Sequence, residues 1–68
     1  MGDTLVLGKV HIGRRAVIGA RSILMPGVSV GENSVVSVQS VVAMNTRIPP
    51  NEVWAGNPAR KVKDIESS

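Results

Sequence analysis

A large apolar residue recurs at every sixth position along most of this 68-residue chain. The series runs from Val6 to Trp54 without a gap. A period of six does not keep to one face of a helix with 3.6 residues per turn, so a helical fold is excluded. A single hairpin explains residues 28–37 but not the rest of the series. The series comprises Val6, Ile12, Ile18, Leu24, Val30, Val36, Val42, Ile48 and Trp54.

The residues around each large apolar position predict the local structure of the six-residue unit. Glycine is concentrated one position later, at Gly13, Gly19 and Gly31, as expected where a chain turns sharply or adopts a positive φ. Each unit is therefore interpreted as a short strand followed by a corner. Three units make a triangular coil of eighteen residues, and neighbouring coils pair at about 4.8 Å. The predicted fold is all-β: a parallel β-helix of three coils, about the minimum for a repeat protein.

Positions eighteen residues apart should stack on one another in such a fold. The large apolar residues would fill the interior, with Val6, Leu24 and Val42 forming one of its columns. Polar residues would occupy two of the outer corners, where they stay in water. The first corner would carry Arg15, Asn33 and Asn51, and the second would carry Arg21, Gln39 and Asn57.

The three flat faces differ in character. Two faces would present apolar residues outward, and the third would present His11, Ser29 and Arg47. Outward apolar rows on a small protein indicate a partner surface, here interpreted as a homotrimer interface. The alternative is ordinary surface valine, because scattered apolar residues are normal on protein surfaces. The proposed interface residues are Val17, Val35 and Val53 on one face and Ile23, Val41 and Ala59 on the next.

Composition limits the chemistry that the chain can perform. It has no cysteine and one histidine, so we expect no disulfide, no thiolate site and no metal site. The net charge of +3 favours an anionic partner. No basic helix or aromatic pattern indicates nucleic acid, and no apolar run approaches the roughly 20 residues that span a membrane. The sequence therefore predicts a cytoplasmic protein that binds neither nucleic acid nor membrane.

The repeat, followed by Ile-Pro-Pro-Asn-Glu-Val-Trp-Ala-Gly-Asn-Pro-Ala-Arg-Lys-Val at 48–62, resembles the bacterial hexapeptide-repeat acyltransferases. Maltose, galactoside and serine acetyltransferases belong to that family. The most specific parts are Ile12-Gly13, Pro26-Gly27-Val28 and residues 55–59. The resemblance implies a left-handed parallel β-helix over residues 1–59, with a C-terminal extension over 60–68. It also implies a trimer that binds acetyl-CoA in a groove between neighbouring subunits.

The resemblance also assigns roles to residues. The family's catalytic histidine lies upstream of the segment that aligns with residues 8–13, so no catalytic residue is expected in this chain. The alternative is that His11 acts in a site completed by a neighbouring subunit. Small corner residues line the family's CoA groove, and basic residues meet its phosphates. The residues assigned to the cofactor are Ala20, Val38, Arg47, Arg60 and Lys61.

Two readings of the whole chain follow. The first is an acetyl-CoA-dependent O- or N-acyltransferase, or its C-terminal part, acting on a small-molecule acceptor that this sequence does not specify. The alternative is a non-catalytic trimeric β-helix, favoured by Val38 and Gln39, which are bulkier than the family's usual residues. Trp54 is predicted to close the last coil, because solenoid ends need capping. Its alternative role is stacking on the adenine of the cofactor.

Overall fold

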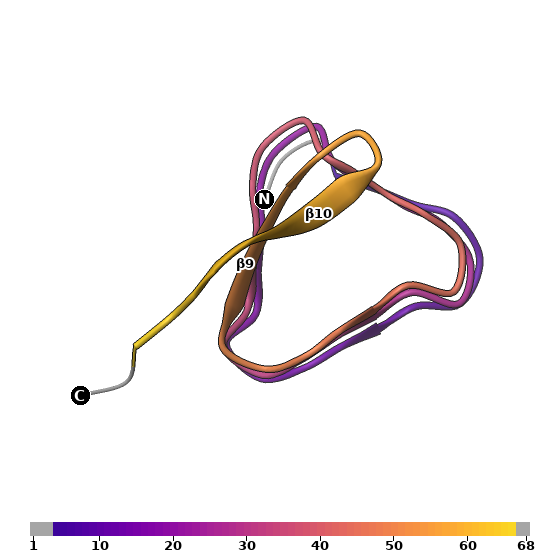
Figure 1. Ribbon diagram of the computed structural model, residues 1–68. Helices are drawn as coiled ribbons and strands as arrows, with labels where there is room; N and C mark the ends of the chain where they lie inside the picture. Colours follow the sequence, from indigo (N-terminus) through magenta and orange to yellow (C-terminus); the bar gives the residue numbers. More distant parts are fainter. Residues whose placement is uncertain (1–3, 67–68) are drawn as a thin grey trace.

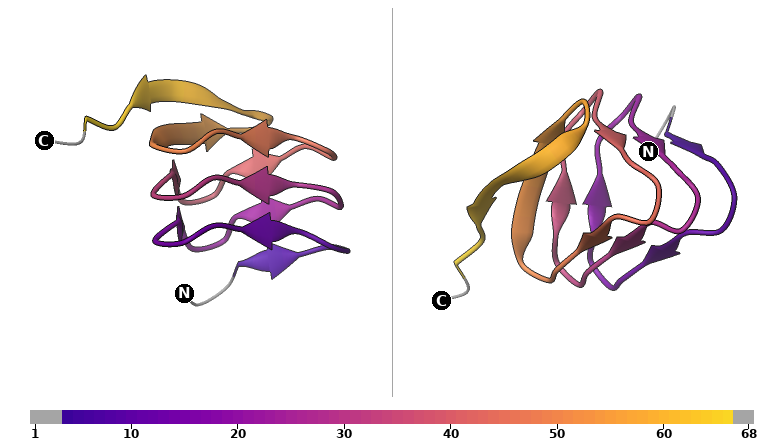
Figure 2. Two further views of the ribbon diagram at one scale, coloured as in Figure 1. Left: turned by 90° about the horizontal axis from the view of Figure 1, so that it is seen from below. Right: turned by 45° about the vertical axis from the view of Figure 1, so that its right-hand side comes forward.

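The chain winds into a triangular helix built only of short strands. The computed structural model describes residues 4–66, and within that range it contains ten strands and no helix. Figure 1 looks along the axis and shows the triangular outline; Figure 2 shows the coils stacked above one another. The strands are β1 (Leu5–Val6), β2 (His11–Ile12), β3 (Val17–Ile18), β4 (Ile23–Leu24), β5 (Ser29–Val30), β6 (Val35–Val36), β7 (Val41–Val42), β8 (Arg47–Ile48), β9 (Glu52–Gly56) and β10 (Ala59–Asp64).

Three parallel sheets form the sides of the triangle. Their strand orders are β1-β4-β7, β2-β5-β8 and β3-β6-β9, and β10 adds an antiparallel strand to the last. Each parallel pair joins residues eighteen apart, as in Val6↔Leu24 and Leu24↔Val42. This register confirms the prediction of three eighteen-residue coils. In Figure 1 the chain runs clockwise as it advances toward the viewer, which is the left-handed sense.

The large apolar column forms the interior, but its two ends differ. Leu24, Val30 and Val42 are fully buried, and Val36 and Ile48 are exposed by only 1%. At the N-terminal end, Val6 and Ile12 remain 43% and 42% exposed. The prediction that the large apolar column is buried is therefore correct from Ile18 to Ile48 and wrong for Val6 and Ile12, and Trp54 is half-buried.

Three buried serines tie successive coils together. Ser22, Ser34 and Ser40 are fully buried, in the small-residue column of the repeat. The Ser22 hydroxyl donates to the carbonyl of Ser37 at 3.0 Å, and the Ser34 hydroxyl donates to the carbonyl of Pro49. A serine at this position satisfies a carbonyl at a corner of the next coil, which an alanine cannot do.

The corners share a backbone conformation that the sequence pattern did not predict. A positive φ recurs at every sixth residue from Arg15 to Asn51, with values between 58° and 82°. Most of these residues are not glycine, although the left-handed conformation costs an ordinary residue about 1–2 kcal/mol. Asparagine tolerates it best, and Asn33 donates through Nδ2 to Oδ1 of Asn51 at 2.8 Å along one corner. The positions are Arg15, Arg21, Gly27, Asn33, Gln39, Asn45 and Asn51.

The glycines of the repeat therefore have a different purpose from the one predicted. Gly13, Gly19 and Gly31 do not lie at the positive-φ positions. They lie where the next coil passes closest: a Cβ on Gly19 would stand 2.4 Å from the nitrogen of Val38. Glycine is needed there for close approach of two backbones.

The chain leaves the helix after β9. The Asn57–Pro58 peptide bond is cis, and the chain reverses into β10, which lies along β9 (Figure 1). Asn57 therefore does not continue the Arg21–Gln39 corner, and Ala59 is buried in β10 instead of lying on an outer face. The hairpin interrupts the register, so both predictions are wrong. β10 begins at Ala59, next to the predicted domain boundary between residues 59 and 60, which stays a prediction.

Candidate cofactor-binding site

Two of the predicted cofactor residues lie on one corner of the helix. Ala20 follows β3 and Val38 follows β6, and both are exposed. The corners are held in register because the amide of Gln39 donates to the carbonyl of Ala20 at 3.0 Å. Gly56 ends β9 eighteen residues after Val38. Val38 is 62% exposed, so its side chain projects from this corner beside the smaller Ala20.

Arg60 belongs to the same region. In the β9–β10 hairpin Arg60 pairs with Ala55, one residue after Trp54, and Trp54 pairs with Val36, two residues before Val38. The side chain is exposed and positively charged. A guanidinium can bind a phosphate through two parallel hydrogen bonds, so this position is suited to an anionic ligand that follows the corner.

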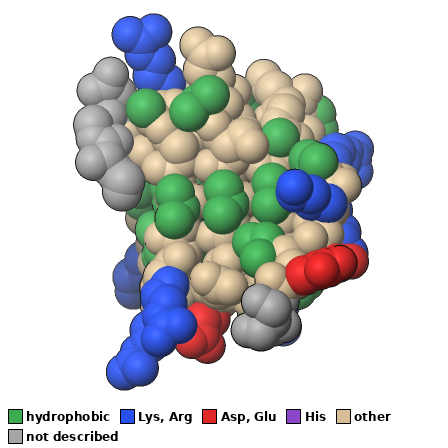
Figure 3. All heavy atoms as spheres, turned by 90° about the vertical axis from the view of Figure 1, so that its left-hand side faces the viewer, with side chains coloured by type: hydrophobic (Ala, Val, Ile, Leu, Met, Phe, Trp, Pro, Cys, Tyr) green, Lys and Arg blue, Asp and Glu red, His purple; other side chains and the backbone are tan. Residues whose placement is uncertain are grey.

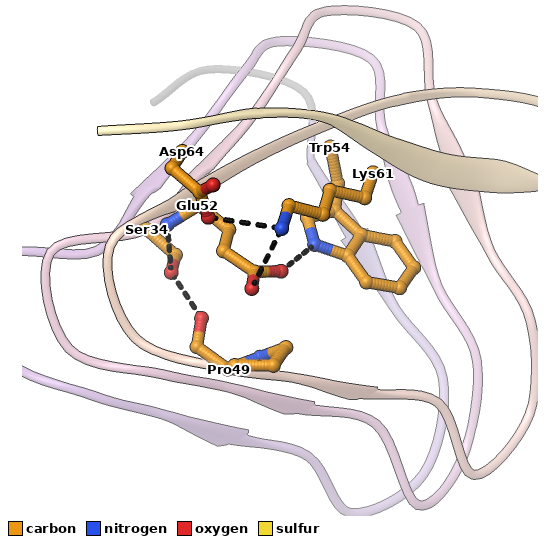
Figure 4. Close-up of polar contacts among 6 residues, drawn as sticks. All are labelled: Ser34, Pro49, Glu52, Trp54, Lys61 and Asp64. Carbon is orange, nitrogen blue, oxygen red and sulfur yellow. Dashed lines mark hydrogen bonds and ion pairs between the residues drawn. The ribbon is translucent and has the colours of Figure 1, made fainter. Parts of the chain in front are cut away.

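Lys61 is engaged by carboxylates of its own chain (Figure 4). Its Nζ lies 2.9 Å from Oδ1 of Asp64 and 3.5 Å from Oε2 of Glu52. The pKa of Lys61 is raised above its ordinary value, chiefly by the hydrogen bond with Asp64 and further by the charge of both carboxylates. The two carboxylates therefore offset part of the positive charge that Lys61 could present to an anionic ligand. The β9–β10 hairpin creates these pairs, and the six-residue repeat does not predict them because β10 lies outside it.

Trp54 lies at the C-terminal end of the interior, as the plug interpretation predicts. Figure 4 shows its ring inside the triangle, and it packs against the buried core. Its indole Nε1 donates to Oε1 of Glu52 at 2.8 Å. Glu52 thus links the indole to Lys61. The alternative role, stacking on adenine, would require the ring to leave this contact.

Arg47 and His11 lie on a different side of the triangle. Arg47 is in β8 and His11 in β2, and both pair with Ser29 of β5 between them. This sheet is not one of the two that flank the Ala20–Val38 corner, so one chain does not bring Arg47 to that corner. A site that used both would need two subunits. Residues 4–66 enclose no pocket and contain no group of three or more side chains able to hold a metal ion.

The outward apolar residues lie where the register predicted. Val17, Val35 and Val53 are aligned across β3, β6 and β9, and Figure 3 shows a row of hydrophobic side chains across this face. Val17 is 50% exposed. Ile23 and Val41 form the shorter row on the β1-β4-β7 sheet. No helix in the described part of the chain is long and apolar enough to cross a membrane.

Comparison with known proteins connects this geometry to a family. The model of the "hexapeptide repeat of succinyl-transferase" matches residues 9–38. Galactoside O-acetyltransferase of Escherichia coli is 41% identical over 56 residues, which is 82% of this chain and 27% of that protein. A hexapeptide-repeat acetyltransferase of Vibrio cholerae, solved in complex with acetyl-CoA, superposes with a TM-score of 0.80 and 30% identity over 88% of this chain and 32% of its own.

A relative with a different name is similar over nearly the whole chain. Gamma carbonic anhydrase 2 of Arabidopsis thaliana mitochondria is 39% identical over 69 residues, covering 97% of this chain and 25% of that protein. The chain thus spans only about a quarter to a third of the length of these relatives. Together, the left-handed parallel coils, the matched repeat and these relatives show that the chain is a hexapeptide-repeat β-helix similar to a segment of known acetyltransferases.

Proposed function

We propose that this chain is part of an acetyl-CoA-dependent O- or N-acetyltransferase and carries one wall of its cofactor groove. The observation that carries the proposal is the exposed corner formed by Ala20 and Val38, with the exposed Arg60 on the β9–β10 hairpin of the adjoining sheet. The small side chain of Ala20 leaves room for a ligand against the backbone, and the exposed Arg60 is available for a phosphate. The relative from Vibrio cholerae binds acetyl-CoA on the same fold.

The five residues assigned to the cofactor differ in how directly they could contact it, given where the structure places their side chains. Ala20, Val38 and Arg60 are proposed as contacts of one ligand along a single corner. Lys61 is proposed as a weaker contact, because Asp64 and Glu52 already hold its ammonium group. Arg47 is proposed to act only from a neighbouring subunit. A catalytic histidine outside this chain remains the proposal for the general base, and the acceptor is proposed to be a small molecule.

A homotrimer is proposed as the assembly that completes the groove. Residues 4–66 form no pocket, whereas two faces carry outward apolar residues. Packing such faces against neighbours would bury them and would bring a second chain to the Ala20–Val38 corner. The cytoplasmic location predicted from the sequence stays a prediction.

Two other functions have specific support. A non-catalytic trimeric β-helix is favoured by the projecting Val38, which narrows the proposed groove. A carbonic anhydrase is suggested by the Arabidopsis relative, but that chemistry uses three histidine ligands for zinc, and this chain contains one histidine. The acetyltransferase proposal is preferred because its proposed cofactor contacts Ala20, Val38 and Arg60 lie in this chain, whereas the chain could supply at most one histidine ligand to zinc.

Binding of acetyl-CoA tests the proposal directly. In calorimetric titrations we expect the chain to bind acetyl-CoA, and dephospho-CoA to bind more weakly because the 3′-phosphate contact is lost. Arg60→Gln should weaken acetyl-CoA binding by roughly tenfold, about the value of one charge-assisted hydrogen bond. Lys63→Gln, on the same strand, is the matched control and should change little. No binding at millimolar ligand would contradict the groove and favour the non-catalytic module.

The trimer proposal is tested by placing a charge on the apolar row. Val35→Glu should dissociate the assembly, because an unpaired carboxylate would be buried in an apolar contact. Sedimentation should give three times the chain mass of 7.2 kDa for the parent and a single chain mass for the variant. Ser29→Glu, at the equivalent outward position of the polar face, should keep the parental mass. A parent that sediments as one chain, or a variant that keeps the trimer, would show that this face is not the interface.

A further inference from the structure

β10 contains one residue more than the part of β9 with which it pairs. Both of its ends are anchored, because Ala59 is buried in the core and the amide of Ile65 donates to a carbonyl just before β9 at 2.8 Å. Between these anchors the register shifts between Lys61 and Lys63, so Val62 is the bulged residue. The position of such a bulge decides which way the neighbouring side chains point.

The ion pairs of Lys61 span this bulge (Figure 4). Residues three apart on a regular strand point to opposite faces, but the bulge brings Lys61 and Asp64 to the same face. The Lys61 Nζ lies 2.9 Å from Oδ1 of Asp64 and 3.5 Å from Oε2 of Glu52. The side chain of Glu52 is only 13% exposed, so its pairing with Lys61 is partly shielded from water.

Arg60 faces away from this group of charges. Adjacent residues on a strand point to opposite faces, so Arg60 lies on the side opposite to Lys61. It pairs with Ala55, which faces the same way as Val53 of the exposed apolar row. This is the outer side of the sheet whose strands β3 and β6 lead into the proposed cofactor corner. Arg60 therefore presents its charge outward, whereas Lys61 directs its own toward the carboxylates.

A different placement of the bulge would reverse these roles. If the extra residue lay nearer to the start of β10, Arg60 would be the bulged residue, and Lys61 would pair with Ala55 and point outward. The anchors at both ends of β10 would be unchanged, so they do not select between the two arrangements. The ion pairs do, because the observed arrangement places Lys61 beside Glu52 and Asp64.

We propose that the two ion pairs of Lys61 position Arg60 for the cofactor. They hold the bulge at Val62 and so keep the Arg60 guanidinium on the outer side of the sheet. This inference rests on the proposed function, because it concerns how firmly a phosphate of acetyl-CoA is held. The main effect of Lys61 on the cofactor is then indirect, and Glu52 and Asp64 favour the binding of an anion although they are themselves negatively charged.

The sign of a charge substitution tests this proposal. Asp64→Ala removes a negative charge from the hairpin, so electrostatics alone would strengthen binding of the anionic acetyl-CoA. We instead expect calorimetric titration to show binding weakened roughly two- to fivefold, the range expected for partly exposed ion pairs. Lys61→Met should weaken binding similarly, and Lys61→Arg, which can keep both pairs, should stay close to the parent. Glu66→Ala makes the same change of charge at an exposed residue just beyond β10 and, as the matched control, should not weaken binding.

Two further measurements separate positioning from direct contact. In the Arg60→Gln background, Lys61→Met should cause no further loss of affinity, because the residue that it positions is already absent. Nuclear Overhauser contacts between Arg60 and Ala55 report the bulge without any ligand. These contacts should weaken in Lys61→Met and in Asp64→Ala, while contacts from residue 61 to Ala55 appear and the β-sheet circular dichroism is retained.

The outcomes distinguish this inference from the proposed function. Tighter binding by Asp64→Ala, additive losses in the double variant, or unchanged Arg60–Ala55 contacts in both single variants would overturn the positioning role. A parent that binds no acetyl-CoA would contradict the proposed function instead. The Arg60–Ala55 contacts would then still decide whether the ion pairs hold the bulge at Val62.

Discussion

Gly31→Ala should destabilise the fold by about 3 kcal/mol or more, a large part of the roughly 3–10 kcal/mol expected for a chain of this size. A Cβ on Gly31 would lie 2.4 Å from the nitrogen of Pro50 and 2.6 Å from the carbonyl carbon of Pro49. These are backbone atoms of the next coil, so no side chain can rotate away. Relief would require the two coils to separate.

The coil spacing at this corner is fixed by hydrogen bonds on both sides of Gly31. Its own amide donates to the carbonyl of Ile48 at 2.7 Å, and the amide of Asn51 donates to the carbonyl of Glu32 at 3.0 Å. Moving the coils apart by the distance that a methyl group needs would break these bonds, each worth about 1 kcal/mol. The steric cost and the hydrogen-bond cost therefore add at the same place.

Two other glycines supply a graded comparison. Gly19→Ala should behave like Gly31→Ala, because its Cβ would also lie 2.4 Å from backbone, at the nitrogen of Val38. Gly13→Ala should cost less, since its closest contact is 2.8 Å from the nitrogen of Glu32. Urea unfolding at one protein concentration measures all three. Equal effects for the three substitutions, or no effect for Gly31→Ala, would contradict the close-approach explanation.

Leu24→Ala should cost about 2–5 kcal/mol, because it removes a large side chain from the centre of the core and leaves a cavity. Leu24 is fully buried in the middle coil, between its register partners Val6 and Val42. The neighbouring coils are held at the spacing of a β-ladder, so the structure has little freedom to collapse into the space. In thermal unfolding the transition should fall by about 10 °C or more, at several degrees per kcal/mol for a domain of this size.

Val6→Ala is the matched control for this prediction. Val6 belongs to the same interior column but is 43% exposed. Its truncation should cost well under half as much as Leu24→Ala, even after allowing for the smaller side chain. If the two substitutions cost the same, Val6 is as well covered in solution as Leu24 and its exposed position is incorrect.

Most of the fold could be predicted because the six-residue period determines where the chain turns and which residues stack. A side chain at every sixth position from Val6 to Trp54 can face a common interior only if each six-residue unit turns the chain through one corner. The register of each parallel pair follows from that count, and so does the outward placement of Val35 and Val41. Handedness was implied only by the family resemblance, because a period of six is the same for either hand.

The candidate site was less predictable. Ala20 and Val38 lie together because they are eighteen residues apart, so their shared corner follows from the repeat. The position of Arg60 depends on the β9–β10 hairpin, whose turn contains the cis Asn57–Pro58 peptide bond and whose second strand lies outside the repeat. The same hairpin brings Glu52 and Asp64 to Lys61, and no local pattern predicts that neutralisation.

The sequence by itself thus determined the repeat unit, the three coils and the residues that face inward, because each of these depends only on position within a six-residue count. The tertiary structure decided why glycine is required at Gly31, which corner residues adopt a positive φ, and how the last coil ends. Those features depend on the distance between backbones eighteen residues apart and on a chain reversal after β9. They arise from contacts between neighbouring coils, so the local sequence pattern does not predict them.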